Sequence, residues 1–164
     1  MMPTTLDENG LNDCSSSQRC DARANNLQTL ATPQTEFAVE LITDRAAFDA
    51  LEGEWNDLFH RAGHSTQIFQ TFNWNWHWAN HYLHDAPGGI PGLKLSIVTG
   101  RRGGKLVMVW PLVSERVRGI TQIFWMGEPV SQYGDVLIDA IPDALECLRA
   151  GWEFLKAHTK GDVV

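Results

Sequence analysis

The sequence is short of cysteine, of long hydrophobic runs and of positive charge, and each shortage excludes a class of protein. It has three cysteines, Cys14, Cys20 and Cys147, and an odd number is unusual in a disulfide-stabilised secreted domain. The longest strongly apolar run, Leu106 to Val113, is far shorter than the roughly 20 residues that a membrane-spanning helix needs. The opening residues lack the basic and apolar regions of a secretory signal. We therefore expect a cytoplasmic protein with free thiols and no membrane partner.

Acidic residues outnumber basic ones by 20 to 13 in this chain of 164 residues, which gives a formal net charge of −7. A surface with this balance repels phosphate groups, so nucleic acid is not an expected partner. Residues 1–35 are polar and nearly free of aromatic and branched side chains. This composition predicts a disordered leader, or one that is not made if translation starts further in. Residues 36–164 carry the apolar side chains of one folded domain.

Hydrophobic periodicity predicts an α/β protein. Alternation over residues 36–42 indicates a strand, and apolar residues at steps of three and four indicate a helix capped by Thr43 or Asp44 and ending near Ala62. Residues 66–84 fit either a strand or a helix, and their length without glycine or proline favours a helix. Further along the chain, the patterns predict strands over residues 93–99, 106–113, 120–126 and 135–138. They also predict a last helix from Pro142 onward.

The chain ends in Gly161-Asp162-Val163-Val164, directly after the last predicted helix. A glycine turn followed by apolar residues is typical of the start of a buried strand. Because the backbone groups of an interior strand need hydrogen-bonding neighbours, we expect this chain to be the front portion of a longer, truncated one.

Three other patterns favour structure over chemistry. His77 and His81 lie four apart and could face one ion on a helix, but Trp78 stands where a zincin has its glutamate, so no metal site is expected. The seven tryptophans could form a sugar-stacking platform, although such residues more often pack in a core or an interface. Gly100 to Lys105 has the composition of a phosphate loop but joins two predicted strands, which favours a hairpin turn.

The most distinctive polar segment is the loop Gly127–Asp135, between two predicted strands. Loops at strand ends are where α/β proteins place their sites, so Gln132, Tyr133 and Asp135 are candidate substrate-binding residues. A hydrogen-bonded turn without a further role explains the same residues equally well. No catalytic residue is predicted, because no serine or cysteine lies in a nucleophile motif.

The order of elements and three local patterns resemble a known family. The patterns are the amphipathic helix through Trp55, the aromatic helix around Phe72-Asn-Trp74-Asn-Trp76, and the strand 106–113 followed by Phe124-Trp-Met-Gly127 and Tyr133-Gly-Asp-Val-Leu137. Together they are similar to the N-terminal half of GNAT-type acyltransferases related to the bacterial cellulose-biosynthesis protein CelD. That group in turn resembles the Fem-type aminoacyl transferases. The resemblance covers residues 36–164.

The resemblance implies a GNAT-like mixed, largely antiparallel sheet flanked by helices, as the first unit of a tandem pair. It also implies acyl transfer from acetyl-CoA or another acyl-CoA to a small-molecule, sugar or amine acceptor. GNAT enzymes hold the donor pyrophosphate on a glycine-rich loop that opens a helix, and this chain has only near misses, at Arg101–Leu106 and Arg116–Thr121. The resemblance therefore implies an acceptor-side portion, inactive alone, whose donor binds to a second GNAT-like unit.

The alternative to an enzyme is a non-catalytic interaction or glycan-binding module. In that case the Trp-rich helix would bind a partner protein or a sugar through its aromatic faces. A metal-binding domain built on His77 and His81 is a third possibility that the spacing alone leaves open.

Overall fold

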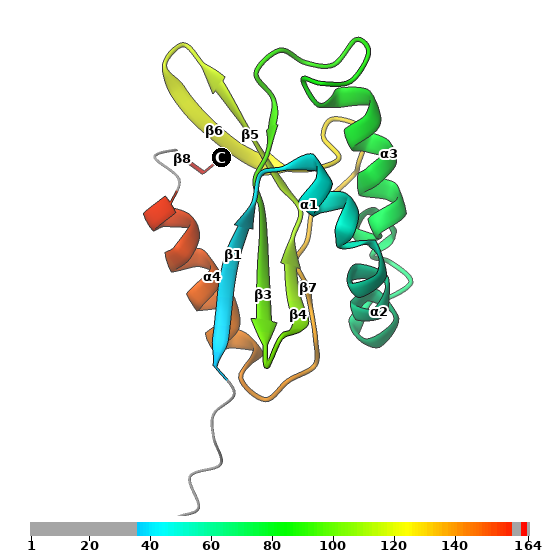
Figure 1. Ribbon diagram of the computed structural model, residues 1–164, viewed down its shortest axis with the longest axis vertical. Helices are drawn as coiled ribbons and strands as arrows, with labels where there is room; N and C mark the ends of the chain where they lie inside the picture. Colours follow the sequence, from blue (N-terminus) through cyan, green and yellow to red (C-terminus); the bar gives the residue numbers. More distant parts are fainter. Residues whose placement is uncertain (1–35, 159–161, 164) are drawn as a thin grey trace, which may run out of the picture. The chain divides into compact units, whose positions relative to one another are not determined.

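The computed structural model describes residues 36–158, 162 and 163. The leader expected over residues 1–35, with Cys14 and Cys20, lies outside the described residues. The described chain is an α/β protein (Figure 1). In chain order its elements are β1 (Phe37–Ile42), α1 (Arg45–Ala50), α2 (Glu52–Ala62), the 3-10 helix η1 (Ile68–Gln70), α3 (Phe72–Tyr82), β2 (Lys94–Leu95), β3 (Ile97–Arg102), β4 (Lys105–Trp110), β5 (Leu112–Val117), β6 (Ile120–Trp125), β7 (Leu137–Ile138), α4 (Ala144–His158) and β8 (Asp162–Val163).

Two four-stranded sheets share one long, bent hairpin. The first sheet has the order β1-β3-β4-β7 and the second has the order β2-β5-β6-β8. The segment of β2 and β3 bends at Ser96 and the segment of β4 and β5 bends at Pro111, so the hairpin passes from one sheet into the other. The Ser96 N–H donates to the Leu112 carbonyl oxygen at 3.0 Å, which joins the two segments through the bend. Pro111 has no N–H to donate, and the predicted interruption of strand 106–113 is confirmed there.

β8 pairs in parallel with β6, with Gln122 opposite Asp162 and Ile123 opposite Val163. All other described strand pairs are antiparallel. α4 supplies the crossover that a parallel pair requires. The α/β class with a largely antiparallel arrangement is therefore confirmed, and so is a strand after Gly161. The expectation of a truncated chain stays a prediction.

The helix predicted from Asp44 to Ala62 forms, but a turn at Leu51 divides it into α1 and α2. Asp44 caps α1, because its side chain accepts the Ala47 N–H at 3.0 Å. The Leu51 N–H donates to the Phe48 carbonyl oxygen at 3.0 Å, a 3-10-type bond that tightens the chain while both side chains stay buried. Apolar periodicity carries no sign of this break, because it remains in phase across the turn.

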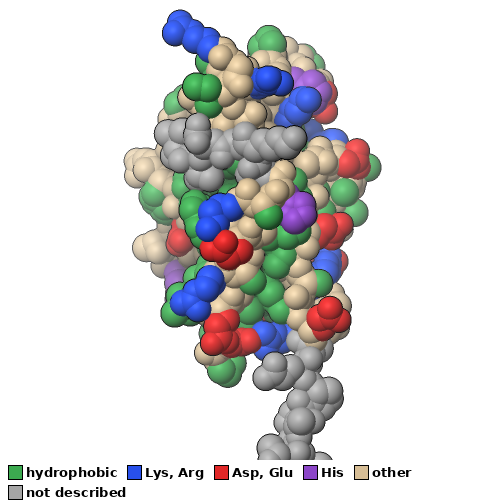
Figure 2. Space-filling model, turned by 90° about the vertical axis from the view of Figure 1, so that its left-hand side faces the viewer, with side chains coloured by type: hydrophobic (Ala, Val, Ile, Leu, Met, Phe, Trp, Pro, Cys, Tyr) green, Lys and Arg blue, Asp and Glu red, His purple; other side chains and the backbone are tan. Residues whose placement is uncertain are grey.

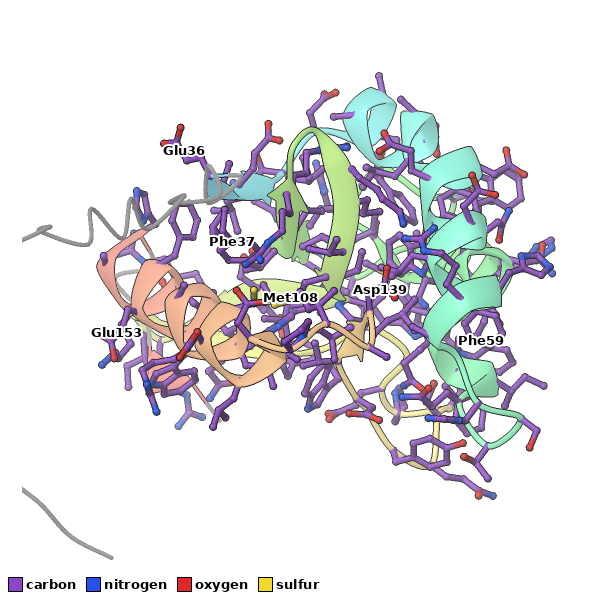
Figure 3. All side chains as sticks on the ribbon, turned by 90° about the horizontal axis from the view of Figure 1, so that it is seen from below. Glu36, Phe37, Phe59, Met108, Asp139 and Glu153 are labelled. Atoms are coloured by element: carbon purple, nitrogen blue, oxygen red, sulfur yellow. The ribbon has the colours of Figure 1, made fainter. Side chains whose placement is uncertain are left out.

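The helices α1, α2 and α3 cover one face of the first sheet, and α4 covers the other face (Figure 1). Aromatic rings contact one another in the core under α1–α3, where the ring centroids of Phe48 lie 6.0 Å from Trp55 and 5.2 Å from Phe72. On the opposite face Met108 points from β4 toward α4 (Figure 3). Gly151 lets α4 approach the sheet there, since a Cβ at that position would lie 2.8 Å from Met108 Cε.

The face that includes α4 carries positive and negative side chains interspersed, with no field of one sign (Figure 2). Lys156 pairs with Glu153 at 2.8 Å on this helix, and Arg102 pairs with Asp143 where the helix begins. No helix in the described part of the chain is both long enough and apolar enough to cross a membrane.

Candidate functional site

α3 arises from the segment whose pattern fitted both a strand and a helix. Residues 72–82 form the helix, so the strand alternative is wrong, and residues 68–70 form the shorter η1. Thr71 is the N-cap of α3, and its Oγ1 accepts the Trp74 N–H at 3.3 Å. The buried Asn75 donates to two backbone carbonyl oxygens of the preceding turn, at 3.0 and 2.8 Å. These bonds fix η1 against the first turn of α3.

Three aromatic side chains follow at steps of four along α3, namely Trp74, Trp78 and Tyr82. Residues four apart lie one above the other on a helix. The rings of Trp78 and Tyr82 are stacked, with centroids 5.1 Å apart and an interplanar angle of 21°. Trp78 is buried, whereas Trp74 and Tyr82 are half-buried. The stripe is therefore buried at its middle residue and partly exposed at both ends.

The loop between β6 and β7 lies against this stripe and accepts hydrogen bonds from its indole N–H groups. Trp74 Nε1 donates to Ser131 Oγ at 2.9 Å, and Trp78 Nε1 donates to the Glu128 carbonyl oxygen at 3.1 Å. Gly127 begins the loop with a φ of 111°, and a Cβ there would lie 2.1 Å from Ser131 Oγ. Glycine alone suits both that backbone conformation and that contact, so Gly127 allows Ser131 to reach Trp74.

A cavity of about 200 Å³ lies between the aromatic stripe and the loop. We call it the aromatic pocket, and its lining residues are Trp74, His77, Trp78, His81, Tyr82 and Val130. Both indole N–H groups already have acceptors in the loop, and the surface that lines the pocket is apolar. Neither imidazole makes a hydrogen bond to another residue of the described ranges.

The three candidate substrate-binding residues, Gln132, Tyr133 and Asp135, do not line the aromatic pocket. One carboxylate oxygen of Asp135 accepts a hydrogen bond from Gln67 Nε2 at 2.7 Å, and the other accepts the next backbone N–H at 2.7 Å. The Tyr133 ring lies edge-on to Phe69, with centroids 5.0 Å apart. Gln132 is exposed. Two of the three thus join the loop to the segment around η1, and their role in binding stays a prediction.

Sequence reasoning missed the aromatic pocket, although part of its signal was available. Trp74, Trp78 and Tyr82 form a second aromatic face at helical spacing, beside the face that packs into the core. The pattern does not show that the β6–β7 loop packs over this face, because the hydrogen-bonded residues Trp78 and Glu128 are 50 positions apart in the chain. Nothing in the sequence marks Val130 as a pocket residue, because the residues of an irregular loop show no hydrophobic periodicity.

A larger cavity, of about 610 Å³, lies beside the start of α4 and includes Arg102, Asp143 and Cys147. Arg102 pairs with the Asp143 carboxylate, and its Nη2 lies 3.7 Å from Cys147 Sγ. Burial raises the pKa of the Cys147 thiol, and the charge of Asp143 adds to this effect. A thiol with a raised pKa stays protonated at neutral pH and is a poor nucleophile. This cavity is therefore a weaker candidate for a reaction site.

The α-helices of the described chain offer no free N-terminus to a donor pyrophosphate. The side chains of Asp44 and Thr71 cap α1 and α3. Glu52 lies in the first turn of α2, and Glu146 lies in the first turn of α4. Carboxylates at these positions complement the helix dipole themselves and repel a phosphate group.

The two near misses to a phosphate loop are hairpin turns. Arg101–Leu106 joins β3 to β4, and Arg116–Thr121 joins β5 to β6, both between antiparallel strands. Glycines at both turns have positive φ, as such turns require. Neither turn opens a helix, and the hairpin predicted around Gly100 to Lys105 is confirmed.

Within the described ranges, no group of three or more His, Cys, Asp or Glu side chains could hold a metal ion. No family model matches this chain, and neither does any curated protein or solved structure.

Proposed function

We propose that this chain is the acceptor-binding unit of a GNAT-like acyltransferase that uses acetyl-CoA or another acyl-CoA. The observation that carries the proposal is the aromatic pocket, a small cavity beside a loop at the end of a strand, where two lining imidazoles make no hydrogen bond to the described residues. A cytoplasmic location, which the odd number of cysteines favours, belongs to the same proposal.

The order of the elements supports a GNAT-like unit. β1 is followed by the helices α1–α3, and the chain from β2 to β6 forms an antiparallel meander. α4 then carries the chain back so that β8 lies parallel to β6. In such a strand–helix–strand unit, ligands bind beside the loop at the carboxyl end of the first strand. The β6–β7 loop occupies that position, and it contributes Val130 to the aromatic pocket.

The helix N-termini support the proposal that the acyl donor binds to a second unit. Each described α-helix begins at a side-chain cap or with an acidic first turn, so none of the α-helices offers a dipole site to an acyl-CoA pyrophosphate. We therefore assign donor binding to a second GNAT-like unit, in the same polypeptide or in a partner. On this proposal the described unit presents the acceptor and is inactive alone.

The alternative function is a glycan-binding or interaction module on the Trp-rich helix, and the hydrogen bonds of the pocket disfavour a glycan. A sugar stacked on an indole also needs partners for its hydroxyl groups, and each buried group without one costs about 1–3 kcal/mol. Trp74 and Trp78 have already donated their N–H groups to the loop. The pocket therefore suits a ligand with few polar groups.

Two measurements test the proposal. Acetyl-CoA is titrated into the 164-residue chain in a calorimeter, and free CoA thiol is followed with a thiol reagent in the presence of amines, for this chain and for the longest polypeptide that its gene encodes. We expect no saturable heat from the 164-residue chain, and amine-dependent thiol release only when a second unit is present. Micromolar binding of acetyl-CoA by the 164-residue chain would contradict the division of labour. Absence of thiol release with both units present would contradict acyl transfer.

A further inference from the structure

A second small cavity, of about 260 Å³, lies against the second sheet, between the ends of β1 and α4 and the strands β2, β5 and β6. We call it the hydroxyl pocket, and its polar lining residues are Thr43, Ser96, Ser114, Thr121, Lys94 and His158. No carboxylate stands among the described residues that line it, whereas the adjoining cavity, which shares Lys94, includes Asp44 and Asp85. Hydroxyl and ammonium groups donate hydrogen bonds to oxyanions, so the composition of the hydroxyl pocket favours an anionic ligand.

Two of these hydroxyl groups are bonded to each other. Ser96 Oγ donates to Ser114 Oγ at 2.8 Å, and Ser96 is only 4% exposed. The Ser114 hydroxyl keeps its own hydrogen, for which no residue of the described ranges supplies an acceptor. The hydroxyls of Thr43 and Thr121 make no hydrogen bond to those residues either. The pocket therefore offers donors that a ligand can use.

Positive charges without a partner gather on the same sheet. Most lysines and arginines in the part of the chain that the structure describes pair with a carboxylate, namely Arg45, Arg61, Arg101, Arg102, Lys105 and Lys156. Lys94, Arg116 and Arg118 pair with no carboxylate of that part, and they lie on β2, on β5 and in the turn after β5. Arg149 on α4 is likewise without a carboxylate partner there.

The strand register places two of these charges on the face of the sheet that the hydroxyl pocket occupies. Lys94 lies opposite Ser114, and Arg116 lies opposite Thr121. Residues opposite each other share a face of the sheet, and so do residues two apart on one strand, so Glu115 points to the other face. Like charges at neighbouring positions of a sheet repel each other. A bound anion would remove this repulsion.

We propose that the hydroxyl pocket binds a phosphate group, either free or carried by a small molecule. The Ser114 and Thr121 hydroxyls donate to its oxygens, and Lys94 and Arg116 neutralise its charge. The formal net charge of −7 opposes anions at long range, but charges more than about 8 Å away are largely screened at physiological ionic strength, so the nearby groups decide.

This site is separate from the aromatic pocket and does not depend on the acyltransferase function. The hydroxyl pocket includes Thr121 near the start of β6, whereas the aromatic pocket includes Val130 beyond the end of that strand. Because Lys94 and Arg116 are exposed and exposed ion pairs are weak, we expect a Kd in the millimolar range for phosphate alone. Acetyl-CoA at micromolar concentration therefore leaves the hydroxyl pocket empty.

The first test is a titration of the 164-residue chain with inorganic phosphate and with phenyl phosphate, at constant ionic strength, followed by the backbone amide signals in NMR. We expect saturable shifts at Ser114 and Thr121. Because Leu41 and Leu95 also line the pocket, about three- to tenfold tighter binding of phenyl phosphate would identify a phosphorylated small molecule as the ligand. Equal binding of the two would identify free phosphate. No saturable shift at these residues, or the same shifts with sodium chloride, would overturn the proposal.

A matched pair of substitutions separates the pocket from a general effect of charge. Lys94 lines the hydroxyl pocket and Arg149 does not, while both are exposed and lack a carboxylate partner among the described residues. Lys94→Gln should weaken phosphate binding about three- to tenfold, and Arg149→Gln, which changes the net charge equally, should weaken it by less than about twofold. Equal weakening by the two variants would show long-range attraction alone and overturn the proposal.

Substitutions of Thr121 test the hydroxyl groups. Valine keeps the shape of threonine and suits a strand, so Thr121→Val removes the donor with little change in packing. It should weaken phosphate binding about threefold or more, and Thr121→Ser, which keeps a hydroxyl, should bind phosphate as the original chain does. Unchanged phosphate affinity in Thr121→Val, or the same loss in Thr121→Ser, would contradict the assignment of this hydroxyl as a donor.

Discussion

The hydrogen bond from Trp74 Nε1 to Ser131 Oγ, 2.9 Å long, holds the β6–β7 loop on α3, and a double-mutant cycle measures its strength. Trp74→Phe removes the donor and keeps an aromatic ring, and Ser131→Ala removes the acceptor. Each single variant also loses packing, but the coupling energy excludes those losses because they occur in both arms of the cycle. The assay is urea unfolding followed by tryptophan fluorescence.

A hydrogen bond between neutral groups contributes a net of about 0.5–1.5 kcal/mol, and this one has ordinary geometry, so we expect a coupling of about 1 kcal/mol. Trp152→Phe is the matched control, because Trp152 is a half-exposed tryptophan of α4 that stacks on Trp110 and does not line the aromatic pocket. Its combination with Ser131→Ala should be additive within about 0.3 kcal/mol. A coupling for Trp74 and Ser131 no larger than this control would refute the claim that the bond fixes the loop.

Three further outcomes follow from particular contacts. Gly53→Ala should raise the free energy of unfolding by about 0.5–1 kcal/mol, because Gly53 lies in α2 with open space around it. Gly134→Ala should lower the free energy of unfolding by about 1–3 kcal/mol, because a Cβ there would lie 2.1 Å from a Trp125 ring carbon. Urea unfolding that ranks the two variants in the opposite order would contradict the packing of the loop. The hydrogen bond to Arg101 lowers the pKa of Glu54 from its ordinary 4.5, so the pair stabilises the fold above that pH and its contribution disappears as the pH falls through the lowered value. Because the pair is largely exposed, Glu54→Gln should reduce the free energy of unfolding at pH 7 by less than about 1 kcal/mol. The variant should also lose less stability than the original protein as the pH falls below 4.5. An unchanged pH dependence would contradict a stabilising role of this pair. With the two leader cysteines replaced by serine, Cys147 should react with iodoacetamide at least about tenfold more slowly in the native protein than in urea, since burial raises its pKa; equal rates would show an accessible thiol.

Local signals in the sequence predict most of the secondary structure. The glycine and arginine segment from Gly100 to Lys105 forms the expected hairpin because glycines accept the positive φ of the turn. Pro111 interrupts a strand because it lacks an N–H, and apolar spacing identifies α4. Each of these features depends on residues that are close together in the chain, which is why they can be recognised without a structure.

The site depends on contacts that are distant in the chain, and this limits what the sequence predicts. The loop residues Tyr133 and Asp135 were candidates for binding because polar loops at strand ends often carry sites. In the structure their contacts are with Phe69 and Gln67, and the pocket is lined instead by residues of α3 and by Val130. The indole N–H groups that could have bound a ligand are used to hold the loop, which only the tertiary structure reveals.

NMR of the tryptophan indole N–H groups during titration with amine acceptors tests most directly the claim that the aromatic pocket binds the acceptor. The rings of Trp74 and Trp78 line the aromatic pocket, whereas Trp55 donates to the Gln70 carbonyl oxygen within the core and Trp152 lies on α4. We predict that the signals of Trp74 and Trp78 shift together and reach saturation while those of Trp55 and Trp152 remain in place. Saturable shifts confined to Trp152, or no saturable shift at Trp74 and Trp78, would contradict the account.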